Sequence, residues 1–350
     1  MSMLAELADV IIGVDTHTDT HTAVAVDRLG AHLATIEVSA DAAGYARLAS
    51  FAAEHAAGLG TAWAIEGCGS HGAGLARALT SAGHLVIEAD RPRRTRRRGG
   101  KSDELDAVRA SRQALAASGH ARPRTGETRE ALRILLATRE HATKTRTATA
   151  STFKALILTA PEDLRAQFRD HATTRQVRDA QTLRPAARQP VSEQHLRRAL
   201  RQLATQISDL DDDLAASLKH LRSLVQSWMP ALLDQPGVGP VSAAQLLVTW
   251  SHPGRFRSEA AFAALTGTSP IPASSGRTAR HRINPYGDRN ANRALHTIAI
   301  SRLRYHQPTI AYAARRTSEG KTTREIRRCI KRYLARNIYR LMEHPALDKP

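Results

Sequence analysis

Four acidic residues occupy positions where carboxylates could gather in one site. Asp15 and Glu66 each end a short apolar run of the strand type. Asp103 and Asp106 are three residues apart at the start of a helical pattern, which places them on one helical face. Carboxylates that lie close together repel one another, and a divalent cation such as Mg²⁺ (or Mn²⁺) relieves that repulsion. Each acid alone is more typical of an ordinary strand end or of complementation of a helix dipole, but the four together favour a metal site that acts on phosphodiesters.

Two histidines beside the first acid suggest a different metal site. His17 and His21 are four residues apart, a spacing that faces one metal only on a helix. A strand and a turn are expected in this stretch, so the sequence favours surface histidines over a zinc site.

A second candidate group surrounds two adjacent hydroxyls, Ser274 and Ser275, which lie between helix-breaking residues and Gly276. A serine next to glycine can approach a phosphate closely, and nearby cations offset charge that develops there. The cations that follow are Arg277, Arg280 and Arg282. A serine nucleophile needs activation, and no base is fixed beside it in the sequence. On spacing alone, a loop rich in turn formers is the favoured interpretation.

The stretch 236–240 resembles a helix-hairpin-helix turn. Gly237 and Gly239 would let backbone N–H groups at a helix start meet a DNA phosphate. A tight turn between helices with no ligand is an equally good interpretation.

Cations dominate the composition. The 51 Lys and Arg outnumber the 33 Asp and Glu, and the net charge of +18 implies a polyanionic partner, nucleic acid before acidic lipid. Only 4% of the residues are aromatic, which suits binding to the phosphate backbone better than extensive base stacking. A solvated, self-repelling loop is the alternative for residues 91–101. The candidate nucleic-acid contacts are Arg93, Arg94, Arg96, Arg97, Arg98 and Lys101 in that run, and Arg327 and Lys331 in a basic amphipathic helix near the C-terminus.

The elements that must position these residues begin with a mixed α/β pattern. Strands are expected over residues 10–15, 22–27, 32–38, 61–66 and 85–90, and helices over 44–58 and 72–82. The first three strands predict an antiparallel meander, and the order is β-β-β-α-β-α-β.

The rest of the chain is predicted to be mostly helical. Residues 102–158 have a helical pattern, and the polar, Arg-rich stretch 159–194 with its three prolines suits a linker. An apolar stripe with a period near 3.5 runs from Leu196 to Trp228 and favours a coiled coil over an amphipathic helix that packs within its own domain. The basic amphipathic helix covers about 322–342.

Several classes of protein are excluded. The two cysteines rule out a disulfide scaffold and a multi-cysteine zinc site, and they fit a reducing compartment. The chain contains no apolar run of about 18 residues that could span a membrane, and its first residues do not have the pattern of a signal peptide. A length of 350 residues predicts two to three domains. The composition and the lack of a membrane span predict a cytoplasmic, nucleoid-associated protein.

Together these segments resemble the insertion-sequence-110 family of DEDD transposases, whose relatives include bridge-RNA-guided recombinases and Piv-type invertases. The resemblance covers nearly the whole chain. Its specific points are GVDTHTDTH at 13–21, Ile65-Glu66, KSDELDA at 101–107, PGVG at 236–239, LTGTSPIPASSG at 265–276 and GDRNANRAL at 287–295. The family commonly has Lys or Arg near Thr18 and often leucine or alanine in place of Thr268 and Ser269, so the chain departs from the pattern there.

The resemblance implies a fold and a domain plan. The fold class is α/β plus α. An RNase H-like (RuvC-like) catalytic domain is expected over 1–160, a linker and coiled coil over 161–230, and a mostly helical C-terminal transposase domain with a helix-hairpin-helix-like turn over 231–350.

The resemblance also implies a chemistry. The acids Asp15, Glu66, Asp103 and Asp106 would hold Mg²⁺, and Ser275, which directly precedes Gly276, would attack DNA and form a covalent protein–DNA intermediate. The implied partners are donor and target DNA, a structured noncoding (bridge) RNA that chooses sequence by base pairing, and other copies of the chain in a tetramer built as a dimer of dimers. Two alternatives stay open: a junction-specific Mg²⁺-dependent endonuclease without a serine intermediate, and a non-catalytic nucleic-acid-binding protein.

Overall fold

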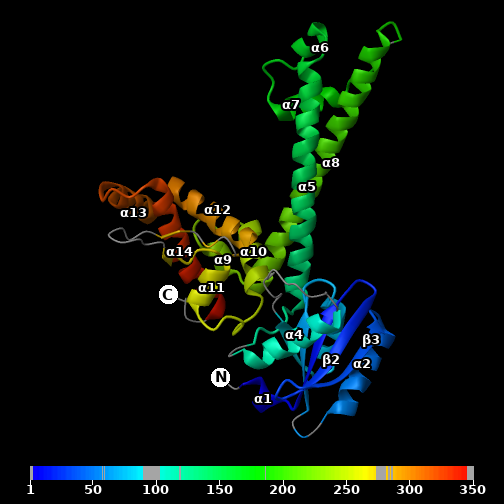
Figure 1. Cartoon of the computed structure of the whole chain (residues 1–350). Coiled ribbons are helices and arrows are strands. Elements are labelled where there is room, and N and C mark those ends of the chain that lie inside the picture. The colour runs from blue at the N-terminus through cyan, green and yellow to red at the C-terminus, as the bar shows by residue number, and fades with distance from the viewer. Residues whose placement is uncertain are drawn as a thin grey trace. The chain divides into compact units, whose positions relative to one another are not determined.

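The computed structural model of the chain describes residues 3–56, 58, 60–89, 103–117, 120–185, 187–272, 281–282, 284 and 287–344 (Figure 1). It separates into two compact units, Met1–Thr125 and Gly126–Pro350.

The first unit is built on a five-stranded sheet in the order β3-β2-β1-β4-β5. The strands are β1 Val10–Thr16, β2 Thr20–Asp27, β3 His32–Ser39, β4 Thr61–Glu66 and β5 Leu85–Ala89. The pairs β1–β2 and β2–β3 are antiparallel, whereas β4 is parallel to both β1 and β5. The predicted meander and the order β-β-β-α-β-α-β are therefore confirmed.

Helices cover both faces of this sheet, because apolar residues alternate along its strands. Val10, Ile12 and Val14 of β1 pack in one core with residues of α2 (Ala42–His55) and α3 (Ala73–Ser81). Ile11 lies on the other face, in a core with Ala107 and its neighbours on α4 (Asp103–Ala116). A short helix, α1 (Leu4–Leu7), adds Leu4 to that second core.

Gly13 sets how closely α4 approaches the sheet. A Cβ atom at this position would lie 2.1 Å from the carbonyl oxygen of Ala107 and 2.9 Å from the Cβ of Ser111. Only a residue without a side chain allows this contact between β1 and α4. Gly13 is two residues before Asp15 in β1, and Ala107 directly follows Asp106 in α4.

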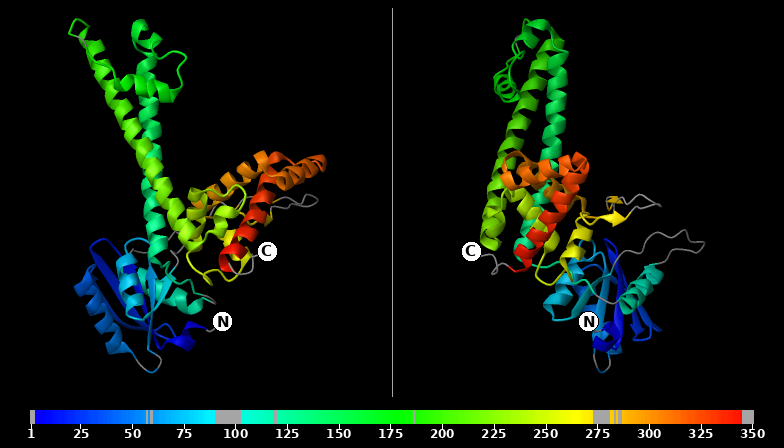
Figure 2. Two further views of the ribbon diagram at one scale, coloured as in Figure 1. Left: turned by 180° about the vertical axis from the view of Figure 1, so that it is seen from behind. Right: turned by 90° about the vertical axis from the view of Figure 1, so that its left-hand side faces the viewer.

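The second unit is helical, and its first part is a long helix pair. α5 (Glu127–Leu158) and α8 (Val191–Trp228) lie side by side in both views of Figure 2. Arg146 of α5 forms an ion pair with Asp211 of α8, and Arg139 Nη1 donates to Ser217 Oγ at 2.7 Å. Leu200 and Ile207 of the predicted apolar stripe are fully buried with Phe153 of α5. The helix that the stripe packs against is thus supplied by the same chain.

The stretch predicted to be a linker is folded, and that interpretation is wrong for most of its length. It contains α6 (Glu162–Ala166) and α7 (Thr173–Gln181), and Leu164, Phe168 and Val177 are buried against α5 and α8. Two of its three prolines are helix N-caps, Pro161 for α6 and Pro190 for α8, so they mark helix starts and not a flexible connection.

The remaining helices surround a second core that contains Trp250, Leu295 and Leu334. They are α9 (Ala231–Asp234), α10 (Pro240–Trp250), α11 (Glu259–Leu265), α12 (Arg289–Tyr305), α13 (Gln307–Ser318) and α14 (Thr323–Glu343). The predicted basic amphipathic helix is confirmed as α14. A two-stranded ribbon, β6 (Ile271–Pro272) with β7 (His281–Arg282), lies between α11 and α12 in the sequence.

Candidate catalytic site

Asp15 and Glu66 lie near the carboxyl ends of two neighbouring parallel strands. Val14 of β1 is the register partner of Ile65 of β4, so the two acids come next along adjacent strands. The alternation of side chains places both on the sheet face that α4 covers, since Ile11, Ala62 and Ala64 belong to that core. The hydroxyl of Thr16 donates to the carbonyl oxygen of Glu66 at 2.9 Å and ties the two strand ends together.

The N-terminal turn of α4 brings two more carboxylates to this face. Asp15, His17 and Asp103 each offer a ligand atom, and these atoms lie within 4.8 Å of one another. Asp106 is close enough for its charge to act on Asp15, but its carboxylate accepts a hydrogen bond from Arg109 Nη1 at 2.5 Å. The structure therefore groups Asp15 with Asp103, with Asp106 nearby and Glu66 on the adjacent strand end.

Burial and like charge both act on Asp15. The residue is 9% exposed, and this desolvation raises the pKa of its carboxyl group above the ordinary value. The charges of Asp103 and Asp106 raise the pKa further, whereas His17 lowers it. A carboxylate that is costly to ionise in the empty fold gains most from a cation. These residues therefore fit a divalent metal ion.

His17 joins the acids, and the sequence interpretation missed it. Its Nε2 atom lies 3.4 Å from Asp15 Oδ2 and 3.4 Å from Asp103 Oδ1. The turn between β1 and β2 fixes it, because the backbone N–H of His17 donates to the carbonyl of Thr20 at 3.0 Å. The signal was the alternation that puts positions 15 and 17 on one face.

His21 is not the surface histidine that the sequence predicted. It is fully buried and stacks on Tyr45 of α2, with ring centroids 5.9 Å apart, on the sheet face opposite Asp15. The two histidines cannot share one metal, which agrees with the rejection of a zinc site.

The serine block and the arginine run lie outside the described residues. This applies to Ser274, Ser275, Arg277 and Arg280, to Arg93, Arg94, Arg96, Arg97 and Arg98, and to Lys101. Arg282, at the end of the block, is exposed in β7.

The two ends of the segment that contains the serines are joined by hydrogen bonds. Asp288 donates its backbone N–H to Leu265 at 2.6 Å, and the Asn292 amide donates to the Thr266 carbonyl at 2.7 Å. Register pairs between β6 and β7 continue the closure. The residues on the two sides of the serine segment are therefore held close together at the start of α12.

Lys331 supports this closure and does not point to solvent, so its assignment as a nucleic-acid contact conflicts with the structure. The residue is 8% exposed, and Nζ donates to Asn292 Oδ1 at 2.8 Å. Burial lowers the pKa of the ammonium group. Arg327, one turn earlier on α14, is half-buried.

Replacing Asn292 with alanine is expected to destabilise the second unit by about 1–3 kcal/mol, because the buried Lys331 ammonium and the Thr266 carbonyl would both lose a partner. Urea denaturation of the full chain measures the change. Asn290→Ala, at an exposed position of the same helix, is the control and should stay within about 0.5 kcal/mol. Equal stability of the two variants would contradict a closure held by Asn292.

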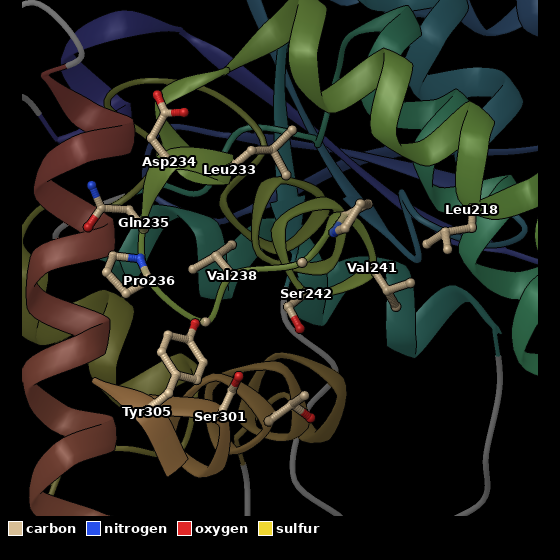
Figure 3. Close-up of a pocket in the computed structure, with 14 residues that line it drawn as sticks. Leu218, Leu233, Asp234, Gln235, Pro236, Val238, Val241, Ser242, Ser301 and Tyr305 are labelled. Carbon is tan, nitrogen blue, oxygen red and sulfur yellow. The ribbon is translucent and has the colours of Figure 1, made fainter. Parts of the chain in front are cut away.

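The glycine turn connects α9 to α10, as the sequence predicted between two helical stretches. Gly237 has φ +78°, a conformation that favours glycine, and Gly239 is the N-cap of α10. Arg302 of α12 donates from Nε to the Pro236 carbonyl at 2.7 Å and holds the turn. Beside the turn is an open pocket of about 620 Å³, lined also by α8 and α12 (Figure 3).

No helix in the described part of the chain is long and apolar enough to cross a membrane. Comparison with protein families gives two matches. A family model described as "Transposase IS116/IS110/IS902 family" matches residues 229–314. A second model, described as "Transposase" and named for DEDD enzymes of the IS110 type, matches residues 12–160. No curated protein matches the chain.

Proposed function

Because the chain belongs to the IS110 family of transposases, we propose that it cuts and rejoins DNA strands as the recombinase of an insertion sequence, with Mg²⁺-bound acids and Ser275 as nucleophile. The observation that supports the metal site best is the convergence of Asp15 and Asp103 beside Glu66 on one sheet face. The strand order β3-β2-β1-β4-β5 supports an RNase H-like catalytic domain, as does helix α4, which brings Asp103 close to Asp15 of β1.

Asp15, Glu66, Asp103 and Asp106 would hold the cation. When bound, Mg²⁺ supplies Lewis-acid stabilisation of charge on phosphate oxygens. The chain's own residues do the positioning: Gly13 lets α4 approach, α4 presents Asp103, and the hairpin turn holds His17 against both carboxylates. Arg109 donates to one carboxylate oxygen of Asp106, so the other oxygen would be the one to reach the cation, and a DNA phosphate is a suitable further partner for that guanidinium.

A strand-exchange assay tests the proposal against its alternatives. The purified chain is mixed with Mg²⁺, a DNA that carries the element's ends, a target DNA and the noncoding RNA transcribed from the element's flank. Rejoined product that requires the RNA is expected. Cut ends that never rejoin would indicate a junction endonuclease, and binding without any cleavage would indicate a non-catalytic protein.

The arginine run is proposed to bind the nucleic-acid backbone. Neutralising Arg96, Arg97 and Arg98 together to glutamine is expected to weaken DNA or RNA binding and to reduce the slope of log K against log salt by about one unit per lost phosphate contact. Fluorescence anisotropy between low and high salt measures the slope. A matched triple variant of the half-buried Arg165 and the exposed Arg169 and Arg175 keeps the net charge change the same. If the slope of log K against log salt falls equally in the two triple variants, binding depends on net charge alone and the arginine run has no specific contact with the backbone.

Self-association is proposed to use the α5–α8 helix pair. Leu203 packs within the chain, so a charge there would disturb folding as well as assembly. Leu158 and Val191 are 70% and 71% exposed, and Leu158→Asp with Val191→Asp is expected to lower the oligomer mass in light scattering while the melting temperature stays unchanged. Leu29→Asp, at an 88% exposed leucine of the first unit, is the control. An unchanged mass in the double variant would place the contact elsewhere.

A further inference from the structure

The pocket beside the glycine turn has a mixed lining that the proposed chemistry does not use. Apolar walls come from Leu218 of α8, Leu233 of α9 and Val238 and Val241 around the turn. Its volume of about 620 Å³ is in the usual range for a site that takes a small planar molecule. The pocket is open to solvent, so a group that belongs to a larger molecule can enter it.

Hydroxyl groups face the pocket without partners of their own. Ser242, in the first turn of α10, is 8% exposed, and its hydroxyl has no hydrogen bond within the described residues. Ser301 of α12 likewise has none there. In Figure 3 the Ser242 and Ser301 side chains point toward each other across the pocket. Both hydroxyls can therefore hydrogen-bond a polar group that enters the pocket.

The charges along the wall argue against a phosphate. Among the described residues that line the pocket, the single charged side chain is the acid Asp234, and Lys and Arg are absent. Arg302 is not among the lining residues, and its Nε donates to the Pro236 carbonyl. The lining side chains suit a neutral group with N–H donors and carbonyl or ring-nitrogen acceptors better than an anion, in contrast to the phosphate contact that the glycine turn by itself predicts.

An aromatic ring stands at the rim. Tyr305, the last residue of α12, lines the pocket and is 55% exposed, which is high for a large side chain next to apolar walls. Exposed tyrosine rings are the platforms on which unpaired bases stack in nucleic-acid-binding proteins.

We propose that this pocket binds one unpaired nucleobase of the nucleic acid that the chain handles, with Tyr305 stacking on the base and the Ser242 and Ser301 hydroxyls hydrogen-bonding its edge. A base enters such a pocket only when it is out of the duplex. The pocket thus recognises the presence of an unpaired base, whereas the arginines bind the backbone. The inference rests on the proposed function only in taking nucleic acid as the partner.

The test is a binding measurement on the full chain without metal. Three duplexes of one sequence are compared in EDTA: fully paired, with one bulged base, and with an abasic bulge, each made as DNA and as RNA. Wild-type protein is expected to bind the bulged base about tenfold more tightly than the abasic bulge. Quenching of a bulged 2-aminopurine reports stacking. The DNA and RNA series identify which nucleic acid supplies the base.

Variants separate the pocket from general binding. Tyr305→Ala is expected to lose the tenfold preference and Tyr305→Phe to keep it, because stacking needs only the ring. Tyr333→Ala, at a 51% exposed tyrosine of α14 outside this pocket, is the matched control and keeps the preference. Ser301→Leu fills the pocket and is expected to lose the preference for the bulged base. The melting temperature of this variant shows whether its fold is intact. If the fold is not intact, the comparison of Tyr305→Ala with Tyr305→Phe decides the question.

Three results would overturn the inference: equal affinity of wild-type protein for the bulged and abasic duplexes, a preference retained by Tyr305→Ala, or a change of oligomer mass in Tyr305→Ala without a change in base preference. The last would assign the pocket to a contact between copies of the chain. The Ser275→Ala protein should keep the base preference, so a failure of strand transfer and a failure of base binding are distinguishable.

Discussion

Ser275→Ala protein is expected to form no covalent link to DNA and to lose strand exchange by at least about a thousandfold. In the proposed step the serine hydroxyl loses its proton as its oxygen bonds to phosphorus, the bond to the leaving DNA oxygen breaks, and that oxygen takes up a proton. A serine hydroxyl is a weak nucleophile at neutral pH, so its attack needs neighbouring charge to stabilise the transition state. Alanine removes the attacking atom and leaves the neighbouring glycine and prolines of the sequence unchanged.

Denaturing gels of protein with end-labelled DNA measure the adduct, and peptide mapping locates it. Ser274→Ala is the matched control, one residue away, and should keep the adduct. An adduct on Ser274, or metal-dependent cutting that continues in Ser275→Ala, would transfer the reaction to a different serine or to the acids alone.

Mixing two inactive proteins extends this prediction to assembly. If the acids of one copy act with the serine of another, Ser275→Ala and Asp15→Asn proteins together should restore part of the linkage, because some interfaces then hold both intact halves. No recovery in the mixture would mean that each copy uses its own acid and serine.

Asp15→Asn is expected to lower recombination by about a thousandfold or more while the metal-free protein keeps or gains stability. Burial and the neighbouring acids raise the pKa of Asp15, so the folded state binds its proton more tightly than the unfolded state does. As pH rises from the ordinary value through the raised pKa, stability is lost, and at neutral pH the ionised group costs folding free energy. Asparagine removes that cost.

Thermal melting with and without Mg²⁺ separates the two effects. Mg²⁺ should raise the melting temperature of wild-type protein and leave that of Asp15→Asn nearly unchanged. Asp19→Asn, an exposed acid in the same hairpin, should behave as wild type. A Mg²⁺ response in Asp15→Asn equal to that of wild type would remove Asp15 from the site.

The sequence predicted the first unit well because strand signals there are local. Asp15 and Glu66 end apolar runs, and the alternation along those runs decides which face each acid occupies. Their proximity depends on β4 pairing with β1, which the strand pattern left open and which the structure contains. The position of His17 was not predicted, because its spacing of four to His21 suggests a shared metal, whereas its contacts are with Asp15 and Asp103.

The second unit shows where local patterns stop being sufficient. The apolar stripe of α8 predicts that a helix packs against it, but a period of 3.5 does not say which chain supplies that helix. Phe168 and Val177 are isolated among arginines, so the burial of α6 and α7 is visible only once α5 and α8 lie beside them. In the sequence Lys331 looks like any other cation of a basic helix. Its burial depends on α12, where Asn292, 39 positions earlier, accepts its hydrogen bond.

Gly13 affects how well the acids can discriminate between divalent ions of different size. Oxygen ligands lie about 2.0–2.1 Å from Mg²⁺ and about 2.3–2.6 Å from Ca²⁺, so a few tenths of an ångström separate a cage that fits one ionic radius from a cage that fits the other. The spacing between β1, which presents Asp15, and α4, which presents Asp103, is limited by the contact at Gly13. Discrimination by ion size at this proposed centre is therefore set by a residue that has no side chain and touches no ion.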